Sequence, residues 1–259
     1  MSFVAALAKV AAMAADAGPP PICTDRPAKG NAVCTVPAGG WQLESSIASW
    51  SLTRSLGVRT STFAIGATVL KTGLSERSDL QIGFTPYVHA RTKADGSSAK
   101  ASATGDLTIR YKRRLTAANA RIQVGVIPSI KLPTASKSMG NGKLEGGLAI
   151  PVAIATGSPV TVVLGPEVNL LADADGSGRH LALINVLNLS APVFPNITLI
   201  GEAWTMTNFD PAHKMTLASA DMALSWLVHD DLQLDAGANF GLNRDTADVE
   251  IYSGLSIRF

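Results

Sequence analysis

The chain ends in DVEIYSGLSIRF, residues 248–259, and apolar and polar residues alternate along this stretch. Ile251 and Leu255 fall on one face of an extended strand, whereas Glu250 falls on the other. A soluble chain usually ends in a frayed polar tail. An amphipathic strand that runs to the last residue, Phe259, indicates that this end of the chain is held in a sheet.

The same two-residue period recurs from Trp41 to the end of the chain. It predicts about twelve strands, most of them about 11 to 15 residues long. Such strands are longer than those of most globular sheets, and they can cross a bilayer at a tilt. The predicted strands span residues 41–53, 59–72, 78–91, 104–115, 120–131, 144–156, 159–171, 180–193, 196–208, 214–228, 231–243 and 247–259.

The polar face of these strands carries ionisable residues, which a sandwich core would not accept unpaired but a hydrated lumen would. We therefore predict an all-β fold, a transmembrane up-and-down antiparallel β-barrel of about 12 strands with its apolar face toward lipid. The lumen charges either pair with one another and stabilise the wall, or some of them line a selective path. The candidate lumen-lining residues are Tyr87, His89, Arg110, Lys112, Arg121, Lys131, Glu167, Glu202, Asp221, Asp235, Asn239, Glu250 and Arg258.

Connector lengths support the barrel, because outer-membrane barrels have short periplasmic turns and longer external loops. Short and long connectors alternate along much of the chain, which places both termini at the short-turn end. An even strand count lets the last strand pair with the first and close the sheet. The predicted external loops are 92–103, 132–143, 172–180 and 209–214. The candidate membrane-interface aromatics are Trp41, Trp50, Trp204, Trp226 and Phe259.

Two segments precede the barrel, which we assign to residues 41–259. Residues 1–15 are Ala-rich and resemble the end of a signal peptide, with an amphipathic helix kept in the mature protein as the alternative. Residues 16–40 are dense in Pro and Gly and predict a short periplasmic segment. This segment contains the two cysteines, Cys23 and Cys34, which are candidates for a disulfide. We expect it to lie free in the periplasm, with entry into the barrel mouth as the second option.

Composition and motifs argue against other classes of protein. A net charge of +2 with scattered basic residues leaves no footprint for nucleic acid. DADGSG at 173–178 matches the opening of a calcium loop, but its twelfth position is Ile184 rather than Glu, so we expect a turn. The four histidines have no metal-ligand spacing, and no nucleophile or nucleotide motif is present. The sequence therefore predicts no cofactor, no metal and no enzyme activity.

Several stretches are similar to a known family: CTDRPAKGNAVCTVPAGGWQLE, SDLQIGFTPYVHAR, GDLTIRYKRRL, GEAWTMTNFD and the last two strands. They resemble the outer-membrane transporters named for the meta-pathway of phenol degradation. The resemblance implies a barrel in the outer membrane of a Gram-negative bacterium that moves small solutes, with hydrophobic or aromatic molecules as one option. The C-terminal aromatic also resembles the signal read by the outer-membrane barrel assembly machinery. The predicted partners are thus membrane lipid, that machinery and a small-molecule solute.

Three alternatives remain open at this level. The first is a non-conducting barrel that serves as a structural or adhesion scaffold. The second is a lipid-active barrel enzyme, although no Ser/His pair stands out in the sequence. The third is a soluble lipocalin-like barrel with its apolar face inward, which would normally have a shorter chain.

Overall fold

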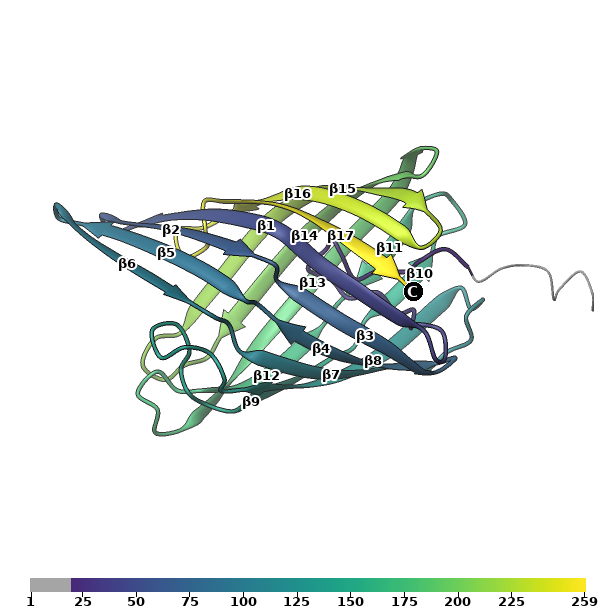
Figure 1. The fold of residues 1–259 in the computed structure, drawn as a ribbon. Coiled ribbons are helices and arrows are strands. Elements are labelled where there is room, and N and C mark those ends of the chain that lie inside the picture. The colour runs from purple at the N-terminus through teal and green to yellow at the C-terminus, as the bar shows by residue number, and fades with distance from the viewer. Residues whose placement is uncertain (1–19) are drawn as a thin grey trace, which may run out of the picture.

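The computed structural model describes residues 20–259, which form one closed antiparallel sheet, a 12-stranded β-barrel (Figure 1). The predicted leader, residues 1–15, lies outside the described residues. None of the described residues belongs to a helix long and apolar enough to cross a membrane. The strand segments are β1 (Trp41–Ser55), β2 (Val58–Ile65), β3 (Thr68–Ser75), β4 (Ser78–Phe84), β5 (Tyr87–Ala94), β6 (Ser97–Ala103), β7 (Leu107–Arg114), β8 (Ile122–Leu132), β9 (Glu145–Ala149), β10 (Val152–Ala155), β11 (Thr161–Leu164), β12 (Glu167–Ala172), β13 (Arg179–Phe194), β14 (Ile197–Asn208), β15 (Met215–His229), β16 (Leu232–Gly241) and β17 (Val249–Arg258).

Closure of the barrel joins the two ends of the sheet, as the sequence predicted. Strand β17 pairs with β16 on one side and with β1 on the other. At the end of this last pairing, the Trp41 N–H donates to the Phe259 carbonyl at 3.1 Å, and the Phe259 N–H donates to the Trp41 carbonyl at 2.9 Å. The last strand therefore completes the ring of backbone hydrogen bonds around the barrel.

The two faces of the wall differ in the way that the alternation predicted. Along β15, Met222 and Leu224 are 58% and 48% exposed, whereas Asp221 and Ser225, which point inward, are each 9% exposed. A soluble barrel would bury the apolar set instead. The outer face is therefore the apolar one, which suits contact with lipid.

Five barrel strands are split into two segments each, namely β2/β3, β4/β5, β6/β7, β9/β10 and β11/β12. The interruptions include Pro86, Pro151 and Pro166, which have no N–H to donate to the ladder. Another is at Gly66, whose φ of 68° is accessible to glycine at little cost. Each interruption can add a residue to one strand, and an odd number of extra residues exchanges its inner and outer faces.

Two expectations are wrong as a result of this local structure. Residues 92–103 are not an external loop: β5 and β6 continue as a hairpin that turns at Asp95 and Gly96, both of which have positive φ. The candidate lumen residues Tyr87 and His89 lie on the outer face, because His89 is opposite Phe63 and Phe63 is opposite Trp50. The alternation of β4 does not continue into β5, since the break at Pro86 reverses it.

Candidate functional site: the lumen and its N-terminal segment

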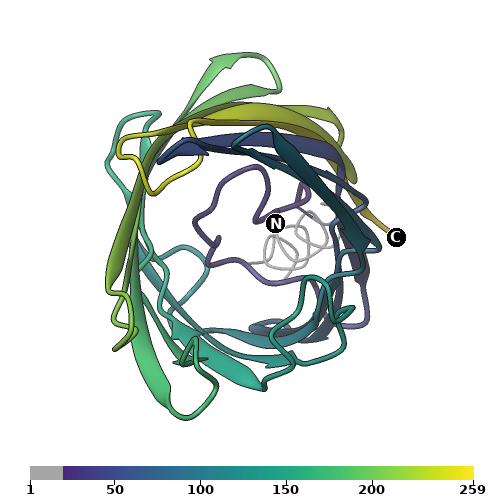
Figure 2. The same cartoon turned by 90° about the vertical axis from the view of Figure 1, so that its left-hand side faces the viewer.

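Residues 20–40, here called the lumenal segment, fold into the barrel (Figure 2). The segment enters at the short-turn end, where the Ile22 N–H donates to the Asp230 carbonyl at 2.6 Å. It returns to the same end, where Ala38 forms a parallel bridge with Gly73 before β1 begins. Our expectation that the segment lies free of the barrel is therefore wrong. The polar inner wall supplies hydrogen-bonding and charged partners for the polar groups of a segment that is too short to form a core of its own.

A disulfide between Cys23 and Cys34 ties the two arms of the lumenal segment together, with their Cα atoms 6.3 Å apart. A covalent bridge across so short a loop restricts the undocked segment and so stabilises its folded form, by roughly 2–3 kcal/mol on the chain-entropy estimate. The backbone carbonyl of Cys23 also accepts a hydrogen bond of 3.0 Å from the Gln42 side-chain amide of β1. The bridge therefore belongs to the part of the segment that contacts the wall.

Reduction of this disulfide should loosen the lumenal segment. We expect trypsin to cleave after Lys29 faster in the reduced protein than in the oxidised one, because the looser segment spends more time outside the barrel. Cleavage is read on a reducing gel, since the bridge would otherwise hold the fragments together. A Cys23→Ser/Cys34→Ser variant is the control and should be cleaved quickly with or without reductant. Equal cleavage rates for the oxidised and reduced wild-type protein would contradict this prediction.

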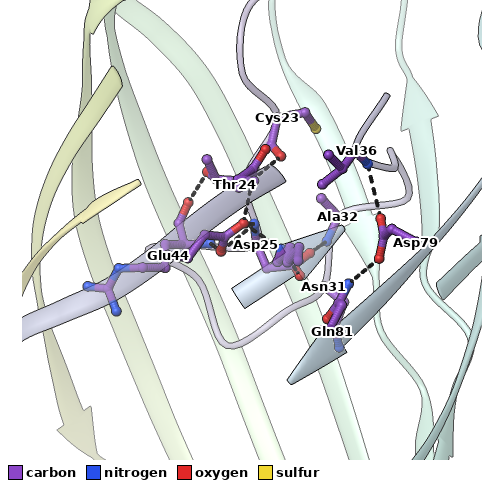
Figure 3. Close-up of polar contacts among 12 residues, drawn as sticks. Cys23, Thr24, Asp25, Asn31, Ala32, Val36, Glu44, Asp79 and Gln81 are labelled. Carbon is purple, nitrogen blue, oxygen red and sulfur yellow. Dashed lines mark hydrogen bonds and ion pairs between the residues drawn. The ribbon is translucent and has the colours of Figure 1, made fainter. Parts of the chain in front are cut away.

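Asp25 of the lumenal segment, which Figure 3 shows beside Glu44, is held at one side of the wall by two lysines. Its carboxylate lies 2.6 Å from Lys71 Nζ of β3 and 2.6 Å from Lys112 Nζ of β7. Both lysine side chains are nearly inaccessible to solvent, at 3% and 2% exposure. The Glu44 carboxylate also pairs with Lys71 and accepts the Asp25 N–H at 3.1 Å. Because removing one partner of a buried pair leaves an uncompensated charge, Asp25 holds the segment strongly.

The next two cations of the segment, Arg26 and Lys29, pair with carboxylates on another side of the wall. Arg26 makes a two-pronged contact with the Asp235 carboxylate, at 2.7 and 3.1 Å. Lys29 Nζ lies 3.1 Å from Asp221 and 4.5 Å from the centre of the Trp204 ring. The segment thus presents a negative residue to a basic wall and positive residues to an acidic wall.

Backbone groups complete the docking at the tip of the segment, residues 29–31. The N–H groups of Lys29 and Gly30 each donate to the Glu202 carboxylate at 3.0 Å. Asn188 donates to the same carboxylate at 3.1 Å. A carboxylate that accepts three hydrogen bonds is stabilised inside the barrel although, among residues 20–259, no cation lies within 4.0 Å of it.

Two glycines of the wall allow the lumenal segment to approach this closely. A Cβ at Gly254 would collide with the Arg26 guanidinium, and a Cβ at Gly73 would collide with the Pro37 carbonyl. Glycine is used where a backbone must approach another group closely. Gly254 lies opposite Asp235, so its missing side chain opens the space through which Arg26 reaches that carboxylate.

Two of the cavities formed by residues 20–259 lie in the lumen, with the tip of the segment between them. One, of about 260 Å³, is lined by Cys23, Asn31 and the short-turn halves of β13 to β16. The other, of about 420 Å³, is lined by Lys29, Asn31, Arg110 and residues toward the long-loop end. Asn31 lines both cavities, and its side chain accepts a hydrogen bond from Arg110. The narrowest part of any route through the barrel is therefore expected beside Asn31.

The larger cavity has a mixed lining. Its polar groups include Lys131, which is paired with Glu145 at 2.9 Å and with Asp106 at 3.0 Å. Arg110 and Glu167 also line it, and among the described residues neither has an opposite charge within 4.0 Å. Apolar groups complete the wall: Ile127, Ala149 and Leu171. Such a lining can accept a small solute that has both a polar group and an apolar body.

Most of the candidate lumen residues lie on the inner face. The sequence analysis offered the option that these lumen charges pair with one another and stabilise the wall. In the structure, several of them contact the lumenal segment instead. Arg121 is exposed at the short-turn rim, where it donates to the Ala155 carbonyl at 3.3 Å. The candidates on the inner face are Arg110, Lys112, Lys131, Glu167, Glu202, Asp221, Asp235, Asn239, Glu250 and Arg258.

The candidate interface aromatics divide between the two faces. Trp204 was wrongly placed at the membrane interface: it points inward, beneath Lys29. Trp50 is on the outer face with Phe63. Trp41, Trp226 and Phe259 are 43%, 49% and 70% exposed, which agrees with outward positions.

Sequence reasoning missed the lumenal partners that matter most, among them Asp25, Lys29 and Lys71. A signal was available, because the segment carries three charged residues in seven, from Asp25 to Asn31, although most of it is uncharged. Glu44 and Lys71 also fall among polar positions of predicted strands. What the sequence could not provide was the pairing of these two sets.

Among residues 20–259, one group of side chains, near the long-loop end, could hold a metal ion. Asp173, His180 and Asp210 offer donor atoms within 4.8 Å of one another. His180 Nδ1 is already 2.7 Å from an Asp173 oxygen. The pKa of Asp210 lies below its ordinary value because the carboxylate accepts backbone hydrogen bonds from Ala212 and Ala174. These contacts join the 173–178 turn to the 209–214 loop without an ion.

The fold and the lumen define a class of protein: a 12-stranded, outward-apolar β-barrel whose lumen holds a docked N-terminal segment. More particularly, residues 24–259 match the family model described as "Putative MetA-pathway of phenol degradation", and the chain belongs to this family. This agrees with the resemblance that the sequence motifs indicated. None of the curated proteins compared with the chain matches it.

Solved structures with a similar fold include an outer membrane channel and two autotransporter domains. The crystal structure of an outer membrane channel from Pseudomonas putida F1 has a TM-score of 0.74 at 16% identity, covering 90% of this chain and 100% of that one. The translocator domain of the autotransporter NalP from Neisseria meningitidis has a TM-score of 0.57 at 14% identity, covering 86% and 90%. The beta domain of the Bordetella autotransporter BrkA gives 0.56 at 12% identity, covering 86% and 100%. At these identities the likeness concerns the fold.

Proposed function

We propose that the protein is a channel in the outer membrane of a Gram-negative bacterium, through which small solutes diffuse beside the lumenal segment. The observation that carries the proposal is the pair of cavities on either side of the Asn31 tip, because they leave space for a solute beside the lumenal segment. The P. putida neighbour is called an outer membrane channel, which agrees with this assignment. Passage rather than catalysis fits a lumen in which most charged groups are engaged by the segment.

The mixed polar and apolar lining of the larger cavity favours small organic solutes over simple ions. The family description points toward phenol degradation, and a phenol has the combination of one polar group and an apolar ring that such a lining accepts. The C-terminal strand β17, which ends beside Phe259, would present the chain to the barrel assembly machinery before closure.

Single-channel recording in a planar bilayer tests the proposal. The full chain should give steady unitary currents, and Asn31→Trp should lower the unitary conductance severalfold because the indole fills the space between the cavities. Asn119→Trp, in an exposed short-turn connector, is the matched control and should leave the conductance unchanged. Silence from folded wild-type protein would contradict the channel and favour the scaffold alternative.

A further inference from the structure

The hairpin ends of β2, β5 and β6 project at the long-loop end of the barrel (Figure 1). Basic residues gather on the outer face of these strands. The register aligns them in rows across the strands. Arg59 of β2 lies opposite Lys93 of β5, and Arg91 of β5 lies opposite Lys100 of β6. We call these four residues the basic patch. Arg54 of β1 extends the first row, because it lies opposite Arg59.

The register also shows that the patch faces outward. Tyr252 points into the lumen, where its hydroxyl donates to the Pro27 carbonyl at 3.0 Å, so its neighbour Ile251 points out. Ile251 lies opposite Trp50, and Trp50 lies opposite Phe63. Directly opposed residues share a face, and so do residues two apart. Arg59, four residues before Phe63, therefore lies on the outer face, and its partner Lys93 lies there with it.

The inner face of the same strands is uncharged. Thr60 of β2 and Thr92 of β5 lie opposite each other there, with their hydroxyl oxygens 3.2 Å apart. Elsewhere in the barrel, the charged residues of the strands mostly face the lumen, as Asp221 and Asp235 do. The break at Pro86 and the corresponding breaks in the neighbouring strands exchange the faces, and the cations appear outside as a result.

The charges of the patch are not neutralised by the protein. Of this group of cations, Arg54 has a partner, Asp248, at 2.9 Å. Among residues 20–259, no carboxylate lies within 4.0 Å of Arg59, Arg91, Lys93 or Lys100, and all four are exposed. Like charges placed directly opposite each other destabilise a sheet. An anion that bridges the strands would remove this repulsion.

The position of the basic patch relative to the hydrocarbon layer of the membrane indicates the kind of anion that it binds. A tilted strand crosses the hydrocarbon in about 9–11 residues, so β1, which starts at Trp41, leaves it near Leu52. Trp50 and Phe63 lie at this level on the outer face, as interfacial aromatics do. The rows of Arg91 and Arg59 follow directly above. A ligand that reaches an outward-facing patch at this level approaches from the membrane surface.

We propose that the basic patch binds the phosphate groups of lipid headgroups in the leaflet next to the long loops. The arginines supply planar forks that bind phosphate oxygens in pairs, and the lysines add charge. Bound phosphates would offset the cross-strand repulsion and anchor the hairpins of β2, β5 and β6 at the surface. The inference rests on the membrane location proposed above, but it does not depend on solute passage.

Native mass spectrometry of the folded protein in detergent micelles tests the proposal, with diphosphorylated lipid A as the probe. The variant is Arg59→Gln/Arg91→Gln/Lys93→Gln/Lys100→Gln. It should bind lipid A on the order of a hundredfold more weakly or worse, because each of the four basic residues at a membrane surface contributes on the order of fivefold in affinity. Dephosphorylated lipid A should bind the wild type and the variant equally weakly.

The control is Lys137→Gln/Arg244→Gln, which removes two exposed cations from loops outside the patch and should bind lipid A like the wild type. Arg59→Lys/Arg91→Lys keeps the charge but removes the planar forks, so its lipid A binding should fall between that of the wild type and that of the four-residue variant. Equal binding of diphosphorylated lipid A by the wild type and the four-residue variant would overturn the proposal. So would wild-type binding of dephosphorylated lipid A that is as tight as its binding of the diphosphorylated form. Displacement of lipid A by millimolar inorganic pyrophosphate alone would show a site for free phosphate and overturn the lipid assignment. Unitary conductance of the variant, which should be unchanged, tests the channel separately.

Discussion

Replacing Asp25 by alanine is expected to release the lumenal segment and raise the single-channel conductance severalfold. The substitution leaves Lys112 without a carboxylate within 4.0 Å in the described chain, and that lysine is 2% exposed. Removing one partner of a buried ion pair costs about 3–5 kcal/mol, because the other charge stays buried and unpaired. The released segment no longer separates the two cavities. Planar-bilayer recording measures the conductance, and trypsin cleavage after Lys29 reports the release independently.

Two further variants make this result specific. Asp25→Ala/Lys112→Met removes the unpaired charge together with its partner, so it should recover part of the docking and part of the low conductance. Asp245→Ala removes an exposed carboxylate from the 242–248 loop, where a surface pair contributes little, and should behave like the wild type. If Asp25→Ala protein keeps both the wild-type conductance and the wild-type resistance to trypsin, Asp25 does not hold the segment in place.

The wall of the barrel could be predicted from the sequence because its physical signal is local. Alternation of apolar and polar residues needs only neighbours in the chain, and β13 to β17 show it with few interruptions. Closure followed from the strand count and from the apolar end at Phe259. Where a proline or a bulge adds a residue, the alternation is still visible but its phase is lost. For this reason Tyr87 and His89 were assigned to the wrong face.

The interior of the barrel could be predicted only in part. The inner positions Glu202, Asp221 and Asp235 follow from the register of their strands. Their partners lie about 170 to 210 residues away in the chain, within a segment that has no period. A Pro- and Gly-rich stretch looks like a free linker when it is considered alone. It becomes ordered here because the wall supplies a complementary charge for each of its ions.

Trp204 is a single residue whose position could not be predicted from the sequence for the same reason, namely that its partner lies in the lumenal segment. A tryptophan on a predicted membrane strand is more often found at the interface, and hydropathy favours that position. The structure places it inward, where its ring face lies 4.5 Å from Lys29 Nζ. A cation over an aromatic face is a favourable contact that needs the cation to be present. Without the docked segment in view, the sequence gives no reason to turn this side chain toward the lumen.

Replacing Leu255 by arginine is expected to cost about 2–4 kcal/mol of folding free energy in lipid, because the charge would face the hydrocarbon. Leu255 lies on the outer face of β17, opposite Ser45 of β1 and Leu234 of β16, so the seam that closes the barrel would carry the charge. Urea-dependent folding into bilayers measures the change.

Glu250→Gln is the matched control on the inner face of the same strand, where the side chain accepts a hydrogen bond of 2.9 Å from Asn239. It should alter ion selectivity with a change in stability of less than about 1 kcal/mol. Equal destabilisation by the two substitutions would contradict the assignment of the apolar face to lipid and of the charged face to the lumen.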